Sequence, residues 1–378
     1  MSQAAFINPT LLAWSRERAG LSEAQLAKKL QAKPERVRTW ETGQSLPTFK
    51  QAQHWANVVH VPFGFLFLKE PPVEKLALPD LRTVGNVAPQ RPSLNLMDTV
   101  KEVMAKQQWY LEYLDEHGRE PLPFVGRFDR SAAVADVVAD MRATLATDPH
   151  AGRFTYEEYA RHLIQACEAI GILVMRSGVA LGNTHRKLDV GEFRGFAISN
   201  VYAPVVFINS ADAPTARLFT LMHELAHLWI GSSGISDGGG PDGRQEEVFC
   251  NAVAGEFLVP EQQLRKLWQA DIDWQQNLAP LASHFHVSTL VIGRRARDLG
   301  LVTREAYSAY YLQVLQAYRD KEGGGGDYYR TATAKNSARF SKAVLAQTMS
   351  GRMLLREAGA LLGVQPAKLK TYAGKLTE

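Results

Sequence analysis

The segment that most constrains this chain is residues 219–230, which read Phe-Thr-Leu-Met-His-Glu-Leu-Ala-His-Leu-Trp-Ile. It contains the pattern His-Glu-x-x-His, with His223 and His227 four residues apart. In a helix this spacing places both imidazoles on one face, where they can bind one metal ion. The apolar neighbours predict a buried helix, in which unpaired ring nitrogens are costly and a metal would satisfy them. A coincidental pair is the alternative, since the bare pattern arises by chance in roughly one in a hundred chains of this length.

A metal site needs a third ligand, and Glu247 is the best candidate. It leads the apolar face of a helix that ends at Pro260, and this face comprises Glu247, Cys250, Ala254, Phe257 and Leu258. An acidic residue at the start of such a face is costly unless it is paired or bound to metal. Glu246 is the rival ligand, but it lies one position off the face.

The glycine-rich residues 231–243 would let this second helix fold back on the first, and Asp237 and Asp242 are interpreted as polar loop residues. Two histidines and one carboxylate leave a fourth zinc position open for water, which is typical of a catalytic site. Glu224 directly follows the first histidine, so we expect it to face the metal-bound water and act as a general base.

Composition bounds the class of protein. A chain of 378 residues is too long for one ordinary core and predicts two to four domains. It begins without a basic segment followed by an apolar one and holds no membrane-spanning apolar run, so we expect a cytoplasmic protein with no membrane partner. Two cysteines, Cys167 and Cys250, make no disulfide framework and are expected in the core.

The net charge of +4 hides a segregation along the chain. Residues 1–70 carry nine Lys and Arg against five Asp and Glu, and residues 294–378 carry fifteen against seven. The middle is therefore acidic, with a net charge of −8. Basic ends around an acidic middle indicate that the ends meet an anionic partner, although ordinary surface scatter is the alternative.

The N-terminal 70 residues predict short helices at 10–19, 22–30, 34–42, 48–59 and 62–68. Ser22 and Gln25 form a capping-box pattern, and Pro34 opens the third helix. This part of the chain resembles the five-helix XRE-type helix-turn-helix of phage repressors, although its turn lacks the usual glycine and has Gln31 instead. The residues that carry the resemblance are Leu26, Ala27, Leu30, Val37, Trp40, Glu41, Gly43 and Pro47. Gln can enter a left-handed conformation at modest cost.

In such a module the second helix of the motif lies in the major groove of double-stranded operator DNA. Its outward positions carry the candidate DNA contacts, and Glu35 also faces outward; the candidates are Lys33, Arg36, Arg38 and Thr39. The arginines could read guanine edges or neutralise phosphates. A module used only for protein contact or dimerisation is the alternative.

The remaining chain predicts a mostly helical α+β protein. Residues 70–96 are Pro-rich and read as a linker, followed by helices at 98–118 and 131–146. A helix at 155–171 precedes three strands at 172–175, 195–199 and 204–209. A sheet directly before the metal helix can pair its edge strand with an extended substrate. Arg194 could bind substrate, but a salt bridge is expected first.

Two further helical regions follow Pro260. Residues 281–299 read as a small helix-turn-helix, in which the spacing of His284 and His286 directs them to different helix faces. We expect neither to bind the metal. Residues 351–372 predict another helix pair. With a net charge of +7 over 330–378, this region could contact DNA or a partner, or simply pack.

The motifs at residues 191–197, 204–209, 219–227 and 247–260, taken in order, resemble the ImmA/IrrE family of zinc metallopeptidases over about residues 160–300. The resemblance implies Zn²⁺ bound by His223, His227 and Glu247, with Glu224 as the catalytic base. Members of that family are often coupled to a repressor or regulator that they cleave or inactivate. Some act in stress response, and others lie beside toxin partners in toxin-antitoxin loci.

Together these features predict four parts. They are a helix-turn-helix domain (1–70), a linker and helical connector (71–153), a small-sheet zincin-like metallopeptidase domain (154–300) and a basic helical region (301–378). We expect a DNA-binding regulator, and a homodimer because operators are two-fold. Its zinc endopeptidase would cleave or control a repressor or toxin. The alternative is a transcriptional regulator or antitoxin without proteolysis, whose zinc domain binds a partner.

Overall fold

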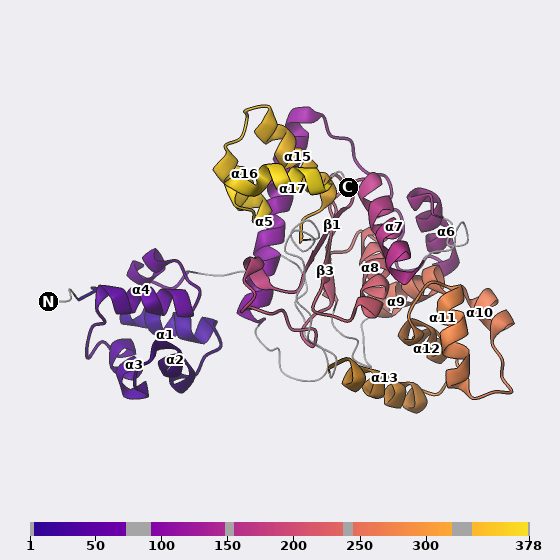
Figure 1. Cartoon of the computed structure of the whole chain (residues 1–378), viewed down its shortest axis with the longest axis horizontal. Helices are drawn as coiled ribbons and strands as arrows, with labels where there is room; N and C mark the ends of the chain where they lie inside the picture. The colour runs from indigo at the N-terminus through magenta and orange to yellow at the C-terminus, as the bar shows by residue number, and fades with distance from the viewer. Residues whose placement is uncertain (1–3, 73–91, 148–154, 237–244, 320–334, 377–378) are drawn as a thin grey trace. The chain divides into compact units, whose positions relative to one another are not determined.

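The computed structural model describes residues 4–72, 92–147, 155–236, 245–319 and 335–376 (Figure 1). Its contacts divide the chain into two compact units. The N-terminal unit comprises residues 1–77 and 91–98, and the larger unit comprises residues 78–90 and 99–378. In the described chain, no helix is long and apolar enough to cross a membrane.

The N-terminal unit has the predicted order of short helices. These are α1 Pro9–Arg18, α2 Glu23–Leu30, α3 Pro34–Glu41, α4 Phe49–Val58 and the 3-10 helix Phe63–Phe67. The capping box of Ser22 and Gln25 is present at the start of α2. Gln31 ends α2 with φ 54°. It therefore takes the left-handed conformation for which a glycine is usual at this turn. Leu26, Val37 and Trp55 are fully buried between the helices.

The larger unit contains a four-stranded mixed sheet with the order β1-β3-β2-β4. Its strands are β1 Leu173–Ser177, β2 Gly195–Ile198, β3 Val205–Asn209 and β4 Gly234–Ser236. β1 runs parallel to β3, whereas β2 is antiparallel to both β3 and β4. Every residue of β2 and β3 is buried, as expected for strands covered on both faces.

Three of these strands confirm the sequence prediction, but β4 lies in the stretch that was expected to be an unstructured loop. β4 has only three residues, too few to show a hydrophobic alternation. Its pairing with β2 is a tertiary contact that a local pattern does not contain. As a result, β4 and not β2 forms one edge of the sheet.

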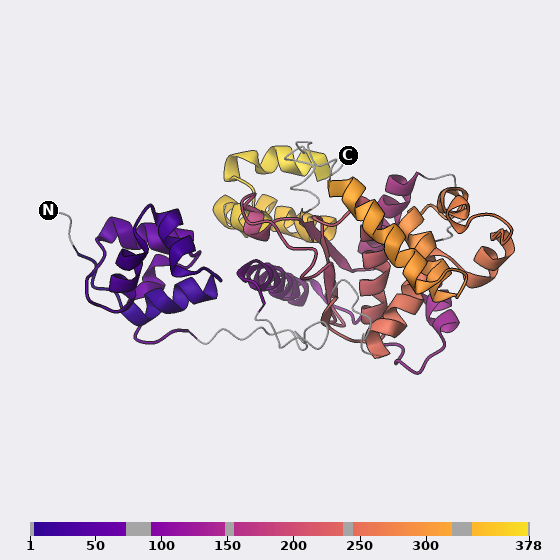
Figure 2. The same ribbon diagram turned by 90° about the horizontal axis from the view of Figure 1, so that it is seen from below.

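Helices cover both faces of the sheet. Figures 1 and 2 show the sheet as a middle layer, with α5 and α15–α17 on one face and α7 and α8 on the other. The helices are α5 Leu94–His117, α6 Val134–Leu145, α7 Tyr156–Ala169, α8 Pro214–Trp229, α9 Gln245–Leu258, α10 Glu261–Leu267, α11 Leu278–His284, α12 Thr289–Asp298, α13 Arg304–Arg319, α15 Ala338–Met349, α16 Leu355–Leu362 and α17 Leu369–Leu376. The helices predicted at 98–118, 131–146 and 155–171 correspond to α5, α6 and α7.

The C-terminal end of α8 is held by residues 122–128, which the sequence presents only as a break between helices. Gly126 and Phe128 donate backbone hydrogen bonds to the carbonyls of Leu228 and Trp229 at 2.9 and 3.1 Å. Both carbonyls belong to the last turn of α8, where carbonyl groups have no hydrogen-bond donors within the helix. A Cβ on Gly231 would lie 3.0 Å from the Cα of Gly126, so the two backbones meet without side chains between them.

The C-terminal helices pack on the same unit through buried polar contacts. The Glu168 carboxylate accepts hydrogen bonds from Ser337 Oγ and the Arg339 amide, both at 2.8 Å, and from the Val174 amide at 3.1 Å. Burial is the main cause that raises the pKa of this carboxyl. One side chain on α7 therefore joins β1 to the start of α15.

Gly195 sets how closely α8 lies on the sheet. A Cβ added there would lie 2.7 Å from Thr220 Cγ2 and 2.8 Å from both Glu224 Oε1 and the Phe207 carbonyl oxygen. We expect Gly195→Ala to lower the free energy of unfolding by about 1–3 kcal/mol, because a backbone atom is among the clashes. Gly234→Ala in β4 is the control, since nothing lies within 4 Å of its added Cβ. Chemical denaturation of both variants tests this, and equal stabilities would contradict it.

Candidate metal centre

The crossing of α8 and α9 brings together two imidazoles and one carboxylate. The Nε2 atoms of His223 and His227 lie 3.1 Å apart. Glu247 places Oε2 3.1 Å from His223 Nε2 and Oε1 3.3 Å from His227 Nε2. One ligand atom from each of the three residues lies within 4.8 Å of the others. Such a group of two imidazoles and a carboxylate suits zinc or a related divalent cation.

The local sequence explains this placement. Pro214 begins α8, whose buried face then carries His223 and His227 one turn apart. Glu247 lies in the first turn of α9, and Cys250, Ala254 and Phe257 of the same helix are fully buried. Packing of this apolar face against α8 therefore carries the carboxylate of Glu247 to the histidines.

The outward nitrogens of both histidines also have partners. Asn251 Oδ1 lies 3.1 Å from Nδ1 of His223, and Glu246 Oε1 lies 3.2 Å from Nδ1 of His227. Ser232 Oγ donates a hydrogen bond to Glu246. Such contacts fix the ring orientation and leave Nε2 to face a metal. Glu246, the rival ligand in the sequence, thus lies at Nδ1 of His227, whereas Glu247 lies at Nε2.

Asn251 is a site residue that the sequence reasoning missed. It lies four residues after Glu247, so both point from the same face of α9 toward α8. That spacing was the available signal, but an amide in an apolar helix has many other uses. Its role follows only from the position of His223.

The charges of the group favour a bound cation. Hydrogen bonding from His227 lowers the pKa of Glu246 to about 2. Burial raises the pKa of Glu247, but both histidines outweigh burial and hold it well below its usual range. Burial lowers the pKa of His223, whereas for His227 the opposing effects of Cys250, Glu246 and Glu247 outweigh burial and raise it. A cation at this point would therefore meet carboxylates that favour the ionised form.

Glu224 is fully buried and lies outside this group of ligand atoms. Its carboxylate lies on the side of α8 that faces the sheet, next to Gly195 of β2. The residue is adjacent in sequence to His223, so it shares the same helical turn without facing the same way. This arrangement leaves a buried carboxylate close to β2.

Other candidate residues lie away from the group. His284 is exposed, and the ring of His286 lies 5.8 Å from that of Tyr159; neither belongs to the His-His-Glu cluster. Asp237 and Asp242 fall outside the described residues. Arg194 has the salt bridge that was expected first, since its Nη1 lies 3.7 Å from Asp212 Oδ2.

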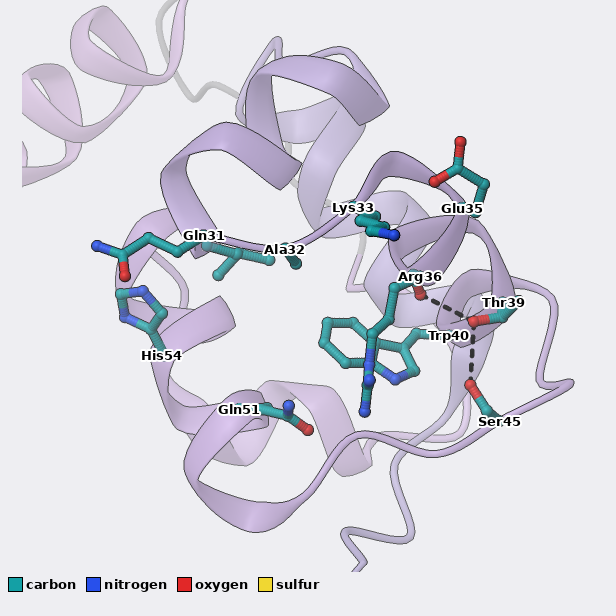
Figure 3. A pocket seen from close by; sticks show the side chains of 11 residues that line it. Gln31, Ala32, Lys33, Glu35, Arg36, Thr39, Trp40, Ser45, Gln51 and His54 are labelled. Carbon is teal, nitrogen blue, oxygen red and sulfur yellow. Dashed lines mark hydrogen bonds between the residues drawn. The ribbon is translucent and has the colours of Figure 1, made fainter.

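In the N-terminal unit, three of the four predicted DNA contacts line one concave surface. Lys33, Arg36 and Thr39 surround it together with the turn at Gln31 (Figure 3). The Arg36 guanidinium lies 5.5 Å from the ring centre of Trp40. Thr39 Oγ1 donates to the Arg36 carbonyl at 3.0 Å and accepts from Ser45.

Arg38 faces elsewhere. Its guanidinium donates to Glu23 Oε2 of α2 at 2.9 Å. The hydrogen bond to this carboxylate is the first cause that raises the pKa of Arg38. Part of its charge is therefore already balanced within the unit.

Residues 167–297 match the family model described as the IrrE N-terminal-like domain, peptidase M78. The match includes His223, Glu224, His227 and Glu247. Residues 336–375 match a family described as a domain of unknown function, DUF8813. A comparison with curated proteins gave no match.

The two carboxylates can be separated by their effect on metal affinity. We expect Glu246→Gln to weaken zinc binding about 10–100-fold, the usual effect of losing an outer partner of a ligand. Glu247→Gln should weaken it more, because it removes a ligand oxygen from the cluster. Competition against a chromophoric chelator measures both. A larger loss for Glu246→Gln would make Glu246 the ligand.

Proposed function

We propose that the larger unit is a zinc-dependent endopeptidase. The observation that carries this proposal is the convergence of His223, His227 and Glu247 on one point, with the buried Glu224 adjacent to His223 in α8. The similarity of residues 167–297 to the IrrE N-terminal-like peptidase domain supports it independently. A structural zinc site usually has four protein ligands and no use for an additional carboxylate at the Glu224 position.

Each residue then has a defined task. His223, His227 and Glu247 hold the cation, and Asn251 and Glu246 keep the two imidazoles turned toward it. Zinc, when bound, supplies a Lewis acid and lowers the pKa of its bound water toward neutrality. The carboxylate of Glu224 accepts a proton from the attacking water and passes it to the leaving amine.

The partner would be a protein. By resemblance to the ImmA/IrrE family, we propose a repressor or a toxin that this unit cleaves or otherwise inactivates. The alternative is a regulator or antitoxin that binds the same partner through the zinc domain without cutting it. The two differ in whether Glu224 is required for the effect on the partner.

Hydrolysis can be tested without knowing the partner. Zinc-loaded wild type and Glu224→Gln are incubated with a proteome-derived peptide library, and new termini are identified by mass spectrometry. We expect the substitution to retain zinc and to lower cleavage by at least about 100-fold, because the general base is lost. A chelator should abolish cleavage by the wild type. Equal cleavage by both proteins would refute the role of Glu224, and none by either would favour the binding alternative.

We further propose that the N-terminal unit binds double-stranded DNA, as a homodimer on a two-fold operator. The concave surface beside α3 carries Lys33, Arg36 and Thr39 at its rim. The net charge of +4 over residues 1–70 supports an anionic partner. DNA binding would set expression of a target operon, and the peptidase would act on a regulatory protein.

The two arginines of α3 should differ in their contribution. Arg36→Ala should weaken binding of full-length protein to selected duplex DNA and reduce the salt dependence by about one phosphate contact. Arg38→Ala removes the same charge from the same helix but should have the smaller effect, because Glu23 already pairs with Arg38. Fluorescence anisotropy at several salt concentrations measures both. A larger loss for Arg38→Ala would contradict the assignment of the main DNA contact to Arg36, and no loss for either variant would contradict the assignment of α3 to the groove.

A further inference from the structure

A second feature of the larger unit lies one helical turn before His223. Phe219 precedes His223 by four residues, so both are on the same face of α8. The Arg294 guanidinium of α12 lies over the Phe219 ring, 4.3 Å from its centre. Through Phe219, the Arg294 guanidinium lies beside the face of α8 that carries His223, about one helical turn before it.

Arg294 is poorly compensated. The nearest carboxylate oxygen recorded for it, Asp298 Oδ2, is 4.0 Å from its Nε. This Nε is buried and donates to no acceptor in the described part of the chain. Asp298 is shared, since it accepts a hydrogen bond at 2.9 Å from the Nε of Arg297. Burial is the first cause that lowers the pKa of Arg294.

The surroundings of Arg294 are also positive. Arg194, from the segment before β2, donates to Tyr311 Oη at 2.5 Å and has Asp212 at 3.7 Å. Asp298 and Tyr307 favour the charged form of Arg294, whereas Arg297 and Arg194 disfavour it. Three guanidiniums therefore share two carboxylates in this cluster. Arginine stays protonated in proteins, so a guanidinium with only a distant carboxylate partner is suited to bind an anion.

We infer that Arg294 forms a subsite for a substrate carboxylate, next to the metal centre and one turn toward the start of α8. The inference rests on the proposed hydrolysis and specifies its substrate class: a peptide with a carboxylate near the scissile bond. A guanidinium fork recognises a planar carboxylate through two parallel hydrogen bonds. Arg194 is already held by Tyr311 and Asp212, so Arg294 is the cation left to bind.

The position of the subsite limits where the carboxylate lies in the substrate. One turn of helix is about 5.4 Å, and an extended peptide advances about 3.3 Å per residue. The carboxylate should therefore occupy one fixed position within about two residues of the scissile bond. It could belong to an Asp or Glu side chain or to the C-terminus of the substrate.

Binding tests the subsite without hydrolysis. Zinc-loaded Glu224→Gln protein is titrated with N-acetyl-aspartate α-methylamide, which has only a side-chain carboxylate, and with N-acetyl-alanyl-alanine, which has only a terminal one. N-acetyl-asparagine methylamide is the uncharged control. We expect one acid to bind and Arg294→Gln to weaken it roughly tenfold or more, the effect of losing a charge-assisted pair. Binding of a carboxylate to zinc itself contributes equally with and without Arg294→Gln, so the difference between the two proteins reports on Arg294.

Arg265→Gln is the matched control variant, because it removes one positive charge from an exposed ion pair with Glu261 on α10. It should leave acid binding within about twofold, since an exposed charge there is screened by solvent. Zinc content and melting temperature are measured for each variant to show that it is folded. Equal acid binding by the parent protein and Arg294→Gln would overturn the inference.

Specificity gives a second readout. The peptide library is compared with the same library after methyl esterification of all carboxyl groups. Wild type should cleave the native library more than the esterified one, with a carboxylate at one fixed position of the cleaved peptides. For Arg294→Gln, the ratio of cleavage of the two libraries should be close to one. Cleavage by wild type without a carboxylate preference would overturn the subsite and leave the proposed hydrolysis intact. If neither library is cleaved, the proposed hydrolysis fails and the binding titration alone decides the subsite.

Discussion

The larger unit depends on polar groups that lie in an apolar interior and need partners there. His223, His227 and Glu224 lie on a helix that is otherwise buried hydrophobic surface. Removing such groups from water costs several kcal/mol unless each finds a partner. Glu247 and Glu246 supply partners for the histidines from a second helix. The crossing of α8 and α9 is thus fixed by charge and hydrogen bonding as well as by shape.

The same constraint explains which parts of the site were predictable. The helical period and the His-Glu-x-x-His pattern are local, so they pointed to the facing histidines directly. Glu247 could be proposed because it leads an apolar face. The distinction between Glu247 and Glu246 was less secure, since adjacent residues differ by only 100° around a helix. The structure places one carboxylate between the two Nε2 atoms and the other against Nδ1 of His227.

Features that depend on distant segments were not predictable in this way. β4 takes its hydrogen bonds from β2, about forty residues earlier, and has no pattern of its own. Residues 122–128 hold the end of α8 from about a hundred residues away, through backbone amides that any sequence possesses. Arg294 reads as one of several arginines on a basic helix until the fold sets it over Phe219. Local propensity carries no information about such pairings.

Glu168 connects two parts of the chain that match different sequence families. The segment that matches a family of its own, residues 336–375, begins where Ser337 and Arg339 donate to this carboxylate on α7. If the C-terminal helices were cut away, a buried acid and the apolar underside of the sheet would meet water together. One carboxylate thus joins residues that fall in two different family matches, Glu168 in the first and Ser337 and Arg339 in the second.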